Sequence, residues 1–126
     1  MKTFDSKLIV TGILFLLTII SGVWLSKTGK PYKMGIVTAH KLISIATLVV
    51  AALAVFQIQK GIALNAVSII LICVSALLFI ALIVSGGMLT RPDTEPLQPV
   101  LFLHKVLPVI TLLVSAFTFY HLKKLL

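Results

Sequence analysis

A histidine followed directly by a lysine, two side chains that could take part in chemistry, occurs twice within apolar sequence. The two copies are His40-Lys41 and His104-Lys105. The two copies stand 64 positions apart. At the same offset and without a gap, Ser21-Gly22-x-x-Leu25-Ser26-Lys27 matches Ser85-Gly86-x-x-Leu89-Thr90-Arg91. Ionisable side chains are rare in hydrocarbon surroundings and mark functional sites there. The repeat therefore predicts one site to which both halves contribute.

The composition indicates an integral membrane protein. The chain has 126 residues, of which 60% are hydrophobic and only 3 are acidic, and its mean hydropathy is +1.19. Four apolar runs each reach the roughly 20 residues that cross a hydrocarbon core about 30 Å thick. They are Leu8–Ser26, Gly35–Gln57, Asn65–Leu89 and Val100–Leu122. We expect an all-α, integral membrane four-helix bundle that forms a single transmembrane domain over residues 1–126.

The internal match divides this bundle into two-helix repeats at about residues 8–60 and 72–124. Four spans place both termini on one side of the membrane, called side A, so the repeats cross in the same sense. They are therefore expected to be parallel repeats with pseudo-twofold symmetry about the membrane normal. The first run follows two lysines and in that respect looks like a signal peptide. Because it is long enough to span and matches the third run, we interpret it as a retained helix.

The positions of the Lys and Arg residues bear on orientation and partners. Side A carries five of them and side B, the opposite side, four, which slightly favours cytoplasmic termini; counting Lys41 and Lys105 on side B reverses the balance. We expect a multi-pass protein of a prokaryotic cytoplasmic membrane. The net charge of +8 comes from helix ends and connectors, where basic residues contact lipid headgroups. The lipid bilayer is thus an expected partner, and nucleic acid is not.

The histidines and glycines are expected to share one layer of the bundle. His40 lies about five residues into the second run and His104 at the matching depth in the fourth, roughly 8 Å from the side-B ends. Gly22 and Gly86 lie at about the same depth. Two opposed imidazoles suit the axial positions of a haem iron, and facing glycines would let the flat porphyrin approach the helices. We expect one haem b per chain, with His40 and His104 as metal ligands.

Lys41 and Lys105 follow the histidines directly and are the next candidates for cofactor binding, with Lys27, Lys30 and Arg91 in the connectors as further ones. They could pair with the anionic haem propionates, or they could extend toward lipid phosphates. Beyond each histidine, at helical spacing, runs a stripe of mostly small residues that would permit close helix packing. The stripe consists of Ser44, Thr47, Ala51 and Ala54 in the first half and Pro108, Thr111, Ser115 and Thr118 in the second.

Four membrane helices with axial histidines from the second and fourth resemble membrane b-type cytochromes, such as the cytochrome b561 and respiratory cytochrome b groups. The resemblance implies a protein that carries single electrons within the membrane between a donor and an acceptor, such as a quinone or a redox protein. Those groups often bind two haems through two histidines on each ligand helix. Here Gln57 stands opposite His121 in the repeat. The second site would lack a ligand, so one haem is expected.

Other interpretations stay open. A small transporter-like protein is one, although no Asp or Glu lies in any apolar run to couple transport to protons or sodium. A non-catalytic membrane subunit or assembly protein without cofactor is another. In these cases His40 and His104 would make polar contacts between helices, and Gly22 and Gly86 would be packing residues. His121, close to Lys123 and Lys124, is interpreted as an interfacial residue. Assembly into homo-oligomers or a larger complex, and a part in an oxidoreductase, are not decided.

Overall fold

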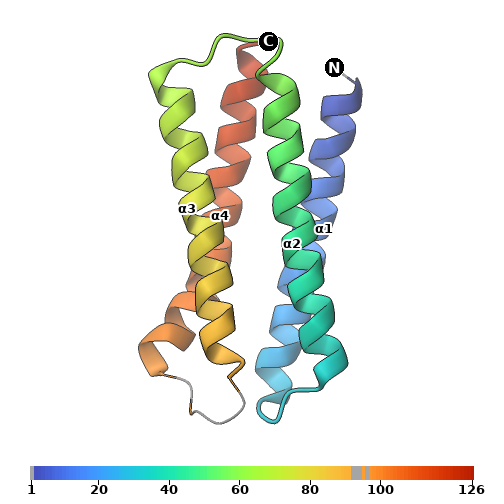
Figure 1. Ribbon diagram of the computed structural model, residues 1–126, viewed down its shortest axis with the longest axis vertical. Coiled ribbons are helices and arrows are strands. Elements are labelled where there is room, and N and C mark those ends of the chain that lie inside the picture. Colours follow the sequence, from blue (N-terminus) through green and yellow to red (C-terminus); the bar gives the residue numbers. More distant parts are fainter. Residues whose placement is uncertain (1, 92–94, 96) are drawn as a thin grey trace. The chain divides into compact units, whose positions relative to one another are not determined.

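The computed structural model describes residues 2–91, 95 and 97–126, and this part of the chain forms four α-helices and no strand. Helix α1 spans Lys2–Thr28, α2 spans Met34–Ile58, α3 spans Ala66–Leu89 and α4 spans Gln98–Lys124 (Figure 1). Each is long and apolar enough to cross a membrane. The predicted fold class is confirmed: the described part of the chain is all-helical, with four helices that can span a membrane and that pair as two two-helix repeats.

The chain divides into two compact units, Met1–Gln57 and Ile58–Leu126. The first contains α1 and α2, and the second contains α3 and α4; in each unit the two helices run antiparallel to one another (Figure 1). This pairing of α1 with α2 and of α3 with α4 fits the two predicted two-helix repeats.

Hydrogen bonds between side chains join the two helices inside each unit. In the first, Lys7 Nζ donates to Gln57 Oε1 over 2.8 Å, and the hydroxyls of Thr18 and Thr47 lie 3.4 Å apart. In the second, the hydroxyls of Ser75 and Thr118 lie 3.1 Å apart. Polar contacts of this kind contribute to helix association in lipid, where apolar side chains gain little by leaving the lipid tails.

Local sequence signals set several helix ends. Gly29 follows α1 with a φ of +65°, a conformation that glycine adopts without steric cost, and its N–H bonds the carbonyl of Leu25. Asn65 caps α3, because its side-chain oxygen accepts hydrogen bonds from both the N–H and the hydroxyl of Ser68. Pro99 lies in the first turn of α4, where its missing N–H costs no helical hydrogen bond.

The buried polar side chains of the described residues all bear hydroxyl groups, and many large apolar side chains are exposed, although others such as Phe4, Phe15 and Leu122 are buried. The predicted small-residue stripe is buried at all but its first position in each half, where Ser44 and Pro108 are half-buried. Thr47 and Thr111, which occupy matching positions, are exposed by only 1% and 0%. The exposed set includes Ile20, Leu42, Leu77 and Leu113. Extended apolar surface of this kind fits contact with lipid tails.

Candidate functional site

His40 points from α2 toward α1 in the first unit. Its Nδ1 atom lies 2.8 Å from the hydroxyl oxygen of Ser21, within hydrogen-bonding distance. Its Cε1 atom lies 3.0 Å from the place where a Cβ on Gly22 would stand. The half-buried imidazole therefore rests on the backbone of α1 at Gly22 and is held by the neighbouring serine.

His104 has the same environment in the second unit. Its Nδ1 atom lies 2.7 Å from the hydroxyl oxygen of Ser85 on α3. Its Cε1 atom lies 3.1 Å from the place of a Cβ on Gly86. The ring is again half-buried. The sequence repeat is thus also a repeat of side-chain geometry, since each half presents one imidazole in the same way.

In each contact, a serine and the glycine that follows it on the same helix have different roles. The glycine provides room, because Cβ atoms essentially never approach another heavy atom closer than 3.0 Å and rarely come within 3.4 Å. The serine provides a polar partner, and its hydroxyl also donates to a carbonyl of its own helix: Ser21 to Thr18 over 2.9 Å and Ser85 to Leu82 over 3.1 Å. Both features depend on the small size of the two side chains.

This arrangement can serve metal chemistry. An imidazole whose Nδ1 is engaged in a hydrogen bond has Nε2 as its second nitrogen, and Nε2 is a common metal donor. Among the described residues, no group of three or more His, Cys, Asp or Glu is placed to hold a metal ion. A haem does not need such a group, because the porphyrin supplies four donors and the protein supplies only axial ones. The donor set of this chain therefore fits a haem.

The glycines have a clear role within each unit, which is to accommodate the imidazole. Their predicted contact with a porphyrin stays a prediction. Lys41 and Lys105 are both exposed, which fits either a cofactor carboxylate or a lipid phosphate as their partner. Their role in binding a cofactor likewise stays a prediction.

The C-terminal ends of α2 and α4, far from His40 and His104, differ between the two units, as the sequence indicates. Gln57 accepts the hydrogen bond from Lys7. His121, its counterpart in the repeat, is half-buried, and its Nε2 atom is buried with no hydrogen-bond partner among the described residues. Gln57 is thus engaged with a lysine of its own unit.

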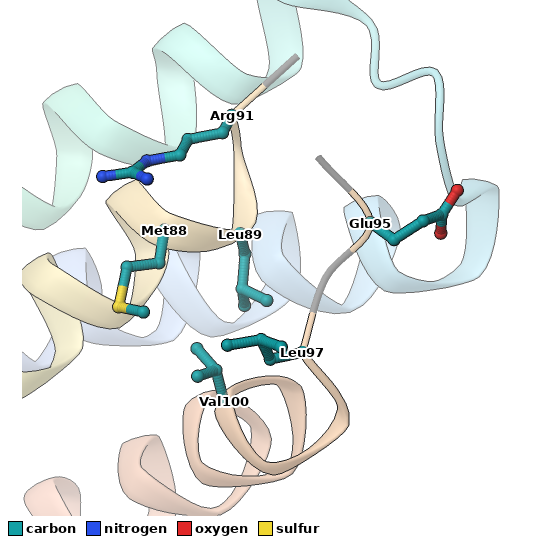
Figure 2. Close-up of a pocket in the computed structure, with 6 residues that line it drawn as sticks. All are labelled: Met88, Leu89, Arg91, Glu95, Leu97 and Val100. Atoms are coloured by element: carbon teal, nitrogen blue, oxygen red, sulfur yellow. The ribbon is translucent and has the colours of Figure 1, made fainter. Parts of the chain in front are cut away.

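A shallow pocket of about 280 Å³ lies between the end of α3 and the start of α4. Figure 2 shows the side chains of Leu89, Leu97 and Val100 pointing toward one another, while those of Arg91 and Glu95 extend away. Val100 precedes His104 by one turn of α4, so the pocket begins about 6 Å along the helix from the histidine. The pocket is lined by apolar side chains together with the charged residues Arg91 and Glu95.

Ser21 and Ser85 are the site residues that the sequence-based prediction missed. A signal for them was present, because each precedes the glycine of the repeated motif. Serine in an apolar helix also packs as a small residue, so its type alone did not indicate a contact with histidine.

No known protein family, curated protein or solved structure matches the chain.

Proposed function

We propose that the protein is a membrane-embedded b-type cytochrome that carries single electrons through one haem b, with His40 and His104 as its axial ligands. The observation that carries this proposal is the repeated geometry of the two histidines. Each is half-buried inside a helix that can span the membrane, and each is held by the same Ser-Gly pair. Two imidazoles held in equivalent ways would supply the two axial nitrogens of one haem iron.

A bound haem would supply the one-electron iron(III)/iron(II) couple. The chain would supply the two axial nitrogens and apolar helices that keep water from the metal. Lys41 and Lys105 would lie near the membrane surface, where they could pair with the propionates. The electron donor and acceptor would be a quinone or a redox protein that reaches this surface or the surrounding bilayer.

A role without cofactor is the main alternative. The contact between Ser21 and His40, and its counterpart between Ser85 and His104, would then act only as polar links between helices. Such links contribute about 0.6 kcal/mol on average in membrane proteins. Half-buried rings are compatible with both haem ligation and a structural role. A purely structural link, however, does not require the same residue pair in both halves.

The deciding experiment is an absorption spectrum of the detergent-purified protein, oxidised and then reduced with dithionite. We expect b-type bands and a pyridine haemochrome ratio near one haem per chain. Changing either axial histidine, as in His40→Ala or His104→Ala, should abolish the six-coordinate spectrum. His121→Ala is the matched control and should keep it. A colourless wild type, made with adequate haem supply, would refute the proposal.

Carbon monoxide tests the ligation independently. Two imidazoles complete the coordination of the iron, so the reduced protein should not bind carbon monoxide rapidly. A fast and complete shift of the Soret band in the wild type would show an open coordination position. That result would replace electron transfer with gas sensing or oxygen chemistry.

A further inference from the structure

We propose that Ser21 and Ser85 are positioning residues that hold His40 and His104 in the tautomer with the proton on Nδ1, so that Nε2 is the coordinating nitrogen of each. This inference rests on the proposed haem function and deepens it. It assigns a role to two residues that contact neither the iron nor the porphyrin in the proposal.

The direction of the hydrogen bonds follows from counting hydrogens. The hydroxyl of Ser21 has one hydrogen and lies within bonding distance of two atoms, Nδ1 of His40 at 2.8 Å and the carbonyl oxygen of Thr18 at 2.9 Å. A carbonyl oxygen only accepts. Both hydrogen bonds form only if the hydroxyl donates to the carbonyl and accepts from an Nδ1–H. The opposite tautomer would leave two oxygen atoms 2.9 Å apart with no hydrogen between them.

The second unit gives the same result independently. The hydroxyl of Ser85 lies 3.1 Å from the carbonyl oxygen of Leu82 and 2.7 Å from Nδ1 of His104. A relay from imidazole to hydroxyl to helix carbonyl is therefore present in each half. Because the carbonyl belongs to the backbone of a helix, the acceptor at the end of each relay is fixed in position.

The relay affects the iron through the basicity of its ligands. An acceptor on Nδ1–H fixes the ring orientation and makes Nε2 a stronger donor. A stronger donor stabilises iron(III) relative to iron(II) and lowers the reduction potential. The neutral hydroxyl is a weaker acceptor than a carboxylate, so the effect is moderate at each histidine. The two serines should contribute equally, because the two contacts are nearly identical.

The test compares Ser21→Ala and Ser85→Ala with the wild type. Each change removes the acceptor, so we expect about 10- to 100-fold weaker retention of haem, the usual cost of losing an outer partner of a metal ligand. The midpoint potential should rise in both variants by similar amounts, and the low-spin g values in the EPR spectrum should shift. Ser21→Thr keeps a hydroxyl and should stay near the wild type. Unchanged potentials and g values in both alanine variants would overturn the inference.

Matched controls are Thr28→Ala in the first unit and Thr90→Ala in the second. The hydroxyls of both threonines bond carbonyls of their own helices, so their loss should leave the haem spectra unchanged. Potential shifts of the same size in these controls would also count against a specific role of the serines.

The outcome separates this inference from the proposed function. A wild type that binds haem, with alanine variants identical to it, refutes only the role of the serines. A colourless wild type refutes the haem, and the tautomer can then be read by ¹⁵N NMR of histidine-labelled protein as purified. Protonated Nδ1 at His40 and His104, lost in the alanine variants, would support the positioning role; protonated Nε2 in the wild type would refute it.

Discussion

The Cε1 atom of His40 lies 3.0 Å from the position that a Cβ atom on Gly22 would take. A distance of 3.1 Å relates His104 to Gly86 in the same way. These two contacts explain why a glycine is repeated at this depth of α1 and α3. A methyl group at either position would require the imidazole to shift by a few tenths of an ångström.

Gly22→Ala and Gly86→Ala should therefore disturb the proposed haem ligands, although alanine favours helices. We expect haem occupancy, measured as the haemochrome ratio, to fall by about 10-fold in each variant, comparable to the loss of a partner that orients a metal ligand. The controls are Gly12→Ala and Gly87→Ala, where an added Cβ meets no described atom within 4 Å. They should bind haem fully. Their free energy of unfolding should be higher by about 0.5–1 kcal/mol, because alanine is more favourable than glycine inside a helix. Full haem occupancy in both site variants would contradict the proposed placement of the rings.

Lys41 and Lys105 provide a test of charge near the proposed haem. Their exposed ammonium groups would stabilise iron(II), the less positive oxidation state, if they lie close to the propionates. Lys41→Gln and Lys105→Gln should keep the six-coordinate spectrum and lower the midpoint potential in a redox titration. Lys60→Gln, which alters a lysine just beyond the opposite end of α2, should leave the potential unchanged. Equal potentials in all three variants would indicate that Lys41 and Lys105 contact lipid phosphates instead.

Thr47 and Thr111 occupy matching positions but differ in their hydrogen bonds. Thr47 Oγ1 donates to the carbonyl of Ile43 over 2.7 Å and lies 3.4 Å from the hydroxyl of Thr18. The buried Oγ1 of Thr111 has no hydrogen-bond partner among the described residues. The repeat places Leu82 at the position that matches Thr18, so the second unit lacks the hydroxyl that lies beside Thr47 in the first.

The same substitution should therefore have opposite effects at these two positions. We expect Thr47→Val to lower the free energy of unfolding by about 1 kcal/mol, the usual worth of a hydrogen bond. Thr111→Val should leave it unchanged or raise it, because replacing an unsatisfied buried hydroxyl with a methyl group removes a desolvation cost. Reversible unfolding in mixed detergent micelles measures both values. A clear loss of stability in Thr111→Val would show that its hydroxyl binds a partner such as water.

The four helices follow from the sequence by itself. The length of an apolar run and the lack of charge inside it are local properties, so they predict each span without knowledge of the neighbouring helices. The helix ends are less well predicted: the run Leu8–Ser26 lies inside the longer helix Lys2–Thr28, because polar residues near a membrane surface continue a helix. Asn65, counted in the third run, is instead the cap that precedes α3.

The sequence also indicated His40, His104, Gly22 and Gly86 as candidate site residues, because ionisable residues in apolar helices are rare and their repetition is visible at a fixed offset. Only the tertiary structure decided that Ser21 and Ser85 bond the histidines and that the glycines receive the imidazole rings. Those contacts depend on how each helix is rotated about its own axis. Helices that are apolar on all sides carry little pattern to specify that rotation. The rotation is set by close packing of small residues and by hydrogen bonds between helices, which exist only once the two helices of a unit have met.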